Sequence, residues 1–266
     1  MDLNEENSLD KTIEALNIFC GLLLISFSQN SNQLSDTITR NFISRGMRCL
    51  QSIFVVWKMG NDQDAFILHR SLIDRLFTLH YLHETKSYSS FEDYSFCKVF
   101  EGREKLISNQ YLHERVSKEV KELHKLEKPK YDALKMSGIN WTRPKPKDVA
   151  KSMGLNILYD FGYDYASMHV HPISDDGMKD FERIIGKIST DETHDLTVVR
   201  NSILVQSLLI QEGLKNSSLR WRAICYKFVE QIREYTGTGN LDYQMTIYTI
   251  AKAWPSFTLF EETNLK

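Results

Sequence analysis

Apolar and polar residues alternate with the period of an α-helix over almost the whole chain. The sequence has neither the alternating valine-rich runs nor the Asn-Gly turns that indicate β-hairpins. The pattern therefore predicts an all-α protein built as a multi-helix bundle. We expect helices at about residues 10–29, 36–59, 64–85, 90–110, 111–125, 156–169, 177–188, 195–235 and 242–254, with a short helix near Val149.

The central segment interrupts this order. Four of the five prolines lie between Pro129 and Pro172, and two of them alternate with lysine at Pro144 and Pro146. Such a composition predicts an irregular basic loop at about residues 127–147. No internal repeat is visible, so we expect residues 1–266 to form a single helical domain whose two halves are joined by this loop.

Composition fits an ordinary soluble protein, since 42% of the 266 residues are hydrophobic and the formal net charge is -2. The apolar run at residues 18–27 is about half as long as a membrane span and follows acidic residues, so we expect a core helix and no membrane contact. The four cysteines are far apart, which is typical of buried thiols in the cytoplasm. No cofactor is expected.

Two short polar segments stand out within the apolar pattern. In the first, Arg70 and Asp74 lie four residues apart and can form a charge-assisted pair on one helical face. In the second, Tyr163, Ser167 and His171 are spaced i, i+4 and i+8, which aligns their polar groups if the helix persists to Pro172. These five residues are the first candidates for a catalytic site.

Two interpretations of these five residues remain open. The imidazole of His171 could move protons beside Ser167 and Tyr163, while Arg70 from the other helix stabilises a phosphate or an oxyanion. Alternatively, the same groups form a hydrogen-bonded network that clamps two helices together. Burial distinguishes the two interpretations, because an exposed cleft favours chemistry and a sealed cluster favours structure.

Other chemical motifs are weaker or missing. Asp160, Asp164, His169 and His171 are potential metal ligands, but histidines two residues apart point to different sides of a helix, so no metal site is expected. The sequence contains no Gly-x-Ser-x-Gly elbow and no phosphate-binding glycine loop.

The two polar segments resemble the bacterial domain of unknown function 5677 (DUF5677) family over roughly residues 34–210. The resemblance depends on an early Arg-Ser-Leu-x-acid motif, here residues 70–74, and a later Tyr-x3-Ser-x3-His-Pro motif, here residues 163–172. This chain has Asp74 where the family usually has Glu. The resemblance implies an all-helical bacterial cytoplasmic protein, and it supplies no reaction.

A second resemblance concerns Arg75 and His80. Their spacing is similar to the Arg-x4-6-His pattern of HEPN ribonucleases, helical proteins in which Arg and His from paired chains cleave RNA without a metal. This pair is the second choice for a catalytic site. Five residues turn a continuous helix by about 500°, so the two side chains would lie about 140° apart unless the helix is broken or a second chain contributes.

Basic residues are concentrated around the central loop. Residues 118–151 hold ten basic and five acidic residues, although the whole chain is slightly acidic. Aromatic residues among the lysines could stack on bases while the charges follow a phosphate backbone. The residues expected to bind RNA are Lys128, Lys130, Tyr131, Trp141, Arg143, Lys145 and Lys147.

These observations favour a bacterial helical effector or interaction protein, as part of an antiphage defence or toxin system that acts on RNA or binds it. The alternatives are a metal-independent HEPN-like ribonuclease and a non-catalytic scaffold or sensor. The expected partners are RNA, another protein of the same system, and a further copy of the chain, because helix faces of this kind also form homo-oligomers.

Overall fold

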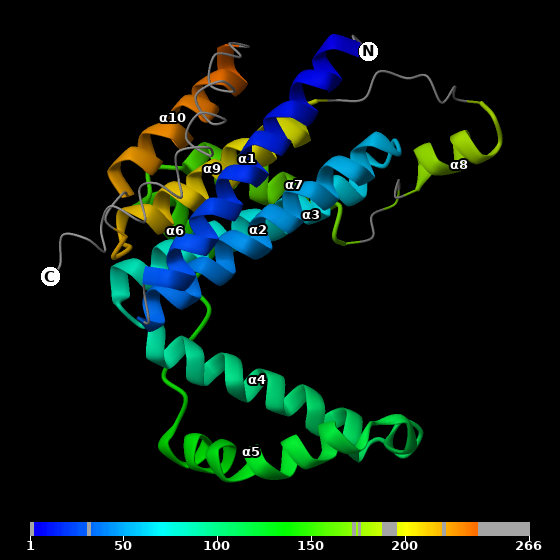
Figure 1. The fold of residues 1–266 in the computed structure, drawn as a ribbon. Helices are drawn as coiled ribbons and strands as arrows, with labels where there is room; N and C mark the ends of the chain where they lie inside the picture. Colours follow the sequence, from blue (N-terminus) through cyan, green and yellow to red (C-terminus); the bar gives the residue numbers. More distant parts are fainter. Residues whose placement is uncertain are drawn as a thin grey trace, which may run out of the picture. The chain divides into compact units, whose positions relative to one another are not determined.

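The computed structural model describes residues 3–30, 33–171, 174, 177–187, 196–219 and 222–238. All regular elements within these residues are helical, which confirms the all-α fold class (Figure 1). In chain order they are α1 (Leu3–Asn30), α2 (Leu34–Lys58), α3 (Asp62–Thr85), α4 (Tyr88–Ser108), the 3₁₀-helix η1 (His113–Arg115), α5 (Lys118–Ser137), α6 (Pro146–Ser152), the π-helix η2 (Leu158–Asp164), α7 (Tyr165–Met168), α8 (Met178–Ile184), α9 (Thr197–Lys215) and α10 (Arg222–Thr238). The helix expected at 242–254 lies outside the described residues.

The chain divides into two compact units. Unit 1 consists of residues 1–81 and 145–266, and unit 2 consists of residues 82–144. Compact units of this kind can belong to one domain, so the single domain expected from the sequence stays a prediction. Unit 1 contains both polar segments found in the sequence.

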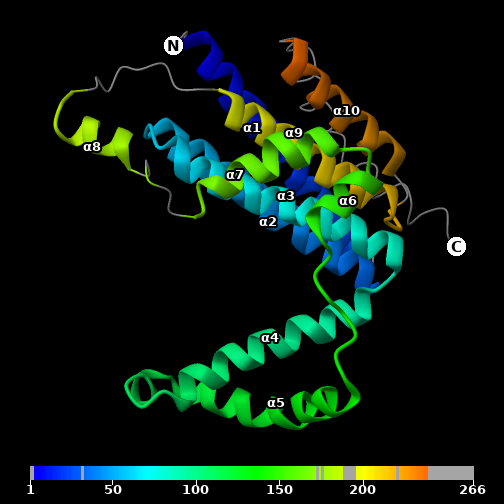
Figure 2. The same cartoon turned by 180° about the vertical axis from the view of Figure 1, so that it is seen from behind.

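Unit 1 is built around α1, α2, α9 and α10, which lie side by side in both ribbon views (Figures 1 and 2). α1 runs antiparallel to α2, since Gln51 donates to Asn17 over 3.1 Å and Lys58 pairs with Glu6 over 2.8 Å. The apolar run at residues 18–27 lies within α1. Its largest side chains are fully buried in the core, together with side chains of the other helices, such as Phe19, Leu23, Phe27, Leu50, Ile53, Trp57, Leu72, Ile73, Leu209, Ile210 and Leu214.

The helix α1 also contains the candidate membrane segment of the described residues. Residues Glu6–Gln29 are long and apolar enough to cross a membrane, but half of that window is buried inside the protein. A core helix of a soluble protein passes the same test of length and composition. The segment is therefore weak evidence for a membrane.

Two glycines bring α2 and α9 unusually close together. A Cβ atom added at Gly46 would lie 2.3 Å from Gln206 Oε1 and 2.6 Å from Leu209 Cδ2. A Cβ added at Gly213 would lie 2.7 Å from Thr39 Cγ2 on α2. Gly213 therefore allows the close packing of α9 against α2.

The long helix expected at 195–235 is instead two helices, α9 and α10, with a break after Lys215. In the break, the Asp36 carboxylate accepts hydrogen bonds from the hydroxyl and from the backbone N–H of Ser218. This side chain comes from 182 positions earlier in the chain. Local periodicity carries no information about such a distant partner.

Unit 2 is a hairpin of α4 and α5. Phe100 is fully buried, and its ring stacks between His124 and Tyr131 with centroids 4.3 and 4.2 Å away. The Glu101 carboxylate accepts hydrogen bonds from Lys135 and from Lys98 at 2.7 and 3.0 Å, and these bonds lower its pKa to about 2. The hairpin thus combines an aromatic centre with ion pairs along its edge.

The prediction of an irregular loop at 127–147 is largely wrong, because α5 continues through Pro129 to Ser137. Pro129 lies on the exposed side of α5, where water can bind the carbonyl that loses its helical partner. Contacts of α5 with α4 on both sides of the proline hold the helix together: Glu127 pairs with Arg103, and Tyr131 stacks on Phe100. Only residues 138–145 are irregular.

Candidate functional site

The two polar segments predicted from the sequence meet in unit 1, where α3 packs against η2. Arg70 of α3 donates from Nη2 to the hydroxyl of Tyr163 over 3.3 Å, and its guanidinium lies 4.9 Å from the centre of the Tyr163 ring. Tyr163 is itself buried and also contacts the ring of Phe77. Figure 2 shows α7, the continuation of η2, in front of α3. Arg70 and Tyr163 therefore join the two helices.

A glycine sets the closeness of this contact. A Cβ added at Gly162 would lie 3.1 Å from Ile73 Cδ1, 3.0 Å from Leu158 Cδ1 and 3.6 Å from His69 Nε2. Gly162 lies in the π-helical turn, whose extra residue per turn a sequence periodicity of 3.6 does not reveal. The π-turn and the glycine together seat η2 against α3.

The predicted line of Tyr163, Ser167 and His171 does not form. Ser167 donates from Oγ to the backbone carbonyl of Tyr163 over 2.7 Å, so its hydroxyl turns back onto its own helix. The helix α7 ends at Met168, and His171 lies beyond it as an exposed residue. The i, i+8 alignment required a helix that continued to Pro172. Asp74 is half-buried one turn after Arg70 on α3.

An aromatic cluster lies beside the contact between Arg70 and Tyr163. The ring of His169 stacks on Phe66 with centroids 5.3 Å apart, and Tyr165 meets both rings edge-on. Phe66 lies one turn before Arg70 on α3. The cluster thus continues the seam between α3 and α7, and it is a packing feature.

His69, which is not among the predicted site residues, is the most deeply buried titratable group of this seam. The Ser202 hydroxyl donates to the carbonyl of Val198 over 2.6 Å, so its lone pair accepts the Nδ1 proton of His69 over 2.8 Å. Nε2 is then unprotonated, and it has no hydrogen-bond partner among the described residues. Burial lowers the pKa of His69 to about 4, so the ring is neutral at pH 7.

The sequence did contain a signal for His69. It falls on the spacing of the buried residues of α3, four after Ala65 and three before Leu72, and that spacing continues to Leu76. A histidine on the apolar stripe of a core helix is expected to be buried and to need one hydrogen-bond partner. Ser202 supplies that partner from 133 residues away, which no local pattern predicts.

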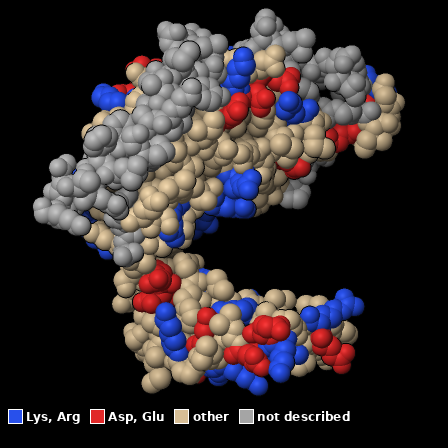
Figure 3. Space-filling model, in the orientation of Figure 1, with Lys and Arg blue, Asp and Glu red and all other residues tan. Residues whose placement is uncertain are grey.

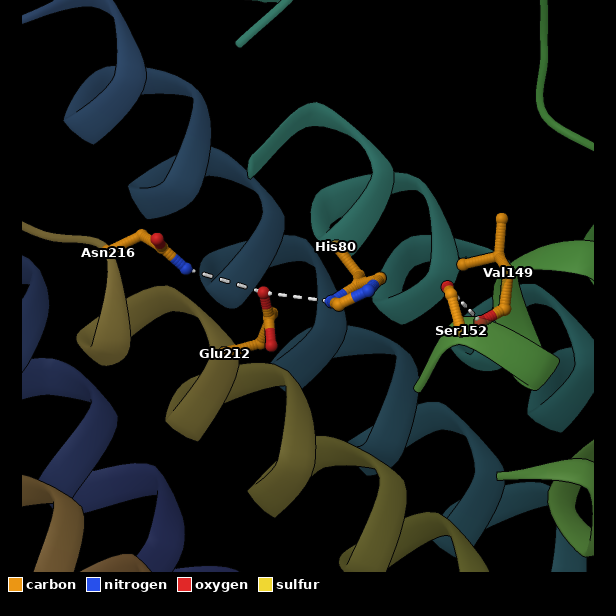
Figure 4. Close-up of polar contacts among 5 residues, drawn as sticks. All are labelled: His80, Val149, Ser152, Glu212 and Asn216. Carbon is orange, nitrogen blue, oxygen red and sulfur yellow. Dashed lines mark hydrogen bonds and ion pairs between the residues drawn. The ribbon is translucent and has the colours of Figure 1, made fainter. Parts of the chain in front are cut away.

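A second buried histidine, His80, is paired with a carboxylate. Its Nδ1 lies 3.2 Å from Glu212 Oε1, and both residues are only 8% exposed. The same oxygen accepts a hydrogen bond from Asn216 over 3.4 Å (Figure 4). On the side of the ring away from Glu212, Figure 4 shows Ser152 of α6, whose hydroxyl donates to Val149. A carboxylate therefore orients this imidazole.

Arg75, the predicted companion of His80, does not join it. The helix α3 is continuous from Asp62 to Thr85, so the two side chains leave it in different directions. The guanidinium of Arg75 turns back to donate to the hydroxyl and the carbonyl of Ser71. Within one chain, the Arg-x4-His spacing does not create a joint site.

The predicted RNA-binding residues are divided between the two units. In unit 2 the Trp141 ring is buried against Phe91 and Tyr94, with centroids 4.9 and 4.7 Å away. Tyr131 stacks inside the hairpin, as described above. Neither aromatic ring is therefore placed to stack on a base.

The basic members of that predicted set differ among themselves. Lys128 pairs with Asp132 over 3.1 Å, and Lys130 lies over the ring of Phe96. Arg143, Lys145 and Lys147 are exposed. Figure 3 shows the basic side chains of unit 2 interspersed with acidic ones, which weakens any attraction for a polyanion.

Metal ligands do not gather at either histidine site. Among the described residues, no group of three His, Cys, Asp or Glu side chains is arranged to hold a metal ion. The four cysteines are buried free thiols, and burial raises the pKa of Cys20 and of Cys225 to about 12. These thiols are poor nucleophiles at neutral pH.

Comparison with known proteins identifies one family. A family model described as a family of unknown function (DUF5677) matches residues 36–184, which is more than half of the chain. The match contains both polar segments and the contact of α3 with η2. No curated protein and no solved structure matches the chain.

Proposed function

This chain belongs to the DUF5677 family, and we propose that it is a helical interaction protein that binds another protein through an exposed apolar row. The row, called here the η2–α7 row, consists of Ile157, Phe161, Tyr165 and Met168. These side chains are 77%, 73%, 43% and 49% exposed. Contiguous apolar residues of this size on a surface are typical of protein interfaces.

The exposure of the row supports one continuous contact surface. All four members are exposed, whereas Gly162, Tyr163 and Ala166 between them are buried, so the row lies on the outward side of η2 and α7. The opposite face is buried against the rest of unit 1 through Gly162, Tyr163 and Ala166. A helix fixed from behind loses little conformational entropy when its outer face binds a partner.

The internal contacts of the candidate catalytic residues support binding over chemistry. Arg70 and Tyr163 contact each other, and the hydroxyl of Ser167 is engaged by its own helix. His171 lies beyond the end of α7. An exposed cleft would favour chemistry, whereas side chains that contact each other or their own helix favour a structural clamp between two helices.

The proposal includes the setting expected from the sequence, namely a bacterial cytoplasmic protein of a defence or toxin system. In such a system the chain would act by holding a partner, and that partner or the exposed Arg143, Lys145 and Lys147 would provide any contact with RNA. The single observation that carries the proposal is the exposed row.

Cysteine labelling tests whether the row is occupied in cells. We expect the thiol of a Phe161→Cys variant to react with a membrane-permeant maleimide several-fold more slowly in intact cells than in the purified protein, because a bound partner covers it. A Met59→Cys variant, at a 78% exposed position on the C-cap of α2, is the matched control. The native cysteines are buried and should react little. Equal labelling at both positions in cells would overturn the proposal.

A second candidate function, a HEPN-like ribonuclease, is favoured by the Glu212–His80 contact. A carboxylate on Nδ1 orients the imidazole and holds the proton on that nitrogen, which leaves Nε2 to accept the proton of a ribose 2′-hydroxyl. Because α3 holds Arg75 on another side, the arginine would have to come from a second chain.

Expression in a bacterial host separates this candidate from the first. A ribonuclease would degrade host RNA, and His80→Ala would abolish the degradation when the two proteins are compared at matched amounts of soluble protein. Glu212→Gln would slow the degradation of RNA by about 10- to 100-fold. His80 remains as the base, but a carboxylate no longer orients its ring. His171→Ala is the control. Intact RNA with the wild-type protein would eliminate the ribonuclease candidate.

A further inference from the structure

We infer that the η2–α7 row binds a basic amphipathic helix of a partner protein. This inference rests on the proposed function and adds the chemistry of the partner. Four large exposed apolar side chains along the outward side of η2 and α7 offer a surface of the kind on which an amphipathic helix lays its apolar face. The row extends from Ile157 to Met168 along η2 and α7, so a partner helix of several turns can lie along it.

The charge beside the row determines whether a positively or a negatively charged partner binds more tightly. Asp160 and Asp164 are both exposed, lie four residues apart, and thus form an acidic line along the apolar row. No lysine or arginine occurs from Ser152 to Met178, and the guanidinium of Arg70, which contacts this segment, donates to the hydroxyl of Tyr163. A partner helix with Lys or Arg beside its apolar stripe complements this surface, whereas an acidic helix would be repelled.

The same charges argue against a second copy of the row, packed antiparallel, as the occupant. Two identical helices that pack antiparallel about a two-fold axis meet along the same edge. Asp160 and Asp164 of one copy would then face those of the other. Like charges across an interface oppose association, and the segment contains no lysine or arginine that would relieve them.

The row is ready to bind without rearrangement. Its helix is held from behind by the contact of Gly162 with Ile73 and by the contact of Tyr163 with Arg70. The exposed side chains therefore stand on a backbone that the core of unit 1 fixes. Such preorganisation leaves more of the contact energy for affinity.

Peptide binding to the full-length protein tests the inference. The probes are two fluorescent 18-residue amphipathic peptides, one of leucine and lysine and the other of leucine and glutamate, and the readout is fluorescence anisotropy at physiological salt. We expect the lysine peptide to bind at least about tenfold more tightly, because opposite charges then meet across the interface.

Three variants assign the binding to the row. Phe161→Asp should weaken the lysine peptide by about tenfold or more through loss of a central apolar anchor, although it adds a negative charge. The double variant Asp160→Lys/Asp164→Lys should reverse the preference between the two peptides. Met59→Asp, at an exposed position outside the row, should leave binding unchanged. Circular dichroism melting checks that each variant is folded.

Several outcomes would overturn the inference. One is the absence of binding by either peptide, and another is equal binding of both. Stronger binding to Phe161→Asp would reveal a general attraction to negative charge. A dimer in light scattering that Phe161→Asp dissociates would assign the row to a second copy. The proposed function survives all of these if the Phe161→Cys variant is protected in cells, and it fails separately if that variant is not.

Discussion

Acidification from pH 6.5 to pH 4 is expected to lower the free energy of unfolding by about 3 kcal/mol through His69 alone. The folded-state pKa of His69 is about 4, below the ordinary value of 6.5, because the buried ring cannot be solvated when charged. Between these values the unfolded chain binds a proton that the folded chain does not. The stability contribution is therefore complete above pH 6.5 and is lost as the pH falls towards 4, by about 1.4 kcal/mol per pH unit.

Urea unfolding at several pH values measures this effect, and two variants isolate it. His69→Phe keeps a ring at the site but removes the titrating group, so about 3 kcal/mol of the pH dependence should disappear. Ser202 still donates to Val198 in that variant, which leaves the hydroxyl partnered. His171→Ala removes an exposed histidine and is the control, for which the free energy of unfolding should depend on pH as it does in the wild type. If His69→Phe has the same slope as the wild type, His69 is not the group that titrates.

Two glycine-to-alanine substitutions are expected to change stability in opposite directions. Gly46→Ala should destabilise unit 1 by about 1–3 kcal/mol, because the new methyl group would lie within 2.6 Å of two side-chain atoms of α9 and would force the helices apart. Gly21→Ala meets no atom within 4 Å on α1, so it should stabilise by about 0.5–1 kcal/mol through helix propensity.

Thermal and urea unfolding of the two variants tests this contrast. The substitution is chemically identical at both positions, so the difference between them reports the space around each glycine. Gly213→Ala should resemble Gly46→Ala, since its Cβ would lie 2.7 Å from Thr39 on the facing helix. Stabilisation by all three substitutions would mean that α2 and α9 do not pack as closely as described.

The sequence predicted the elements that local patterns control. The apolar spacing of α2 and α3 and the Gly60 turn between them were sufficient, because helix period and a glycine with positive φ are local properties. The two polar segments also indicate that Arg70 could meet the Tyr163 segment, and the structure shows that contact.

Other features could not be predicted, because distant partners decide them. Pro129 indicated a loop, but contacts with α4 hold the helix through it. The 3.6-residue period placed His171 on the line of Tyr163, whereas a π-turn and the end of α7 separate them. The partner of His80 is Glu212, 132 residues later, and no local motif connects the two.

The glycine contact between α2 and α9 has a consequence for how the chain folds during synthesis. Gln206 on α9 donates to the carbonyl of Ile43 on α2, across 163 positions of sequence. The core of unit 1 therefore cannot close until α9 has left the ribosome, and until then the apolar faces of α1 and α2 lack a major partner. Unit 2 depends on contacts between neighbouring helices, so it can fold while the rest of the chain is still being made. The interval between these two events is when the nascent chain is most exposed to aggregation and most dependent on chaperones.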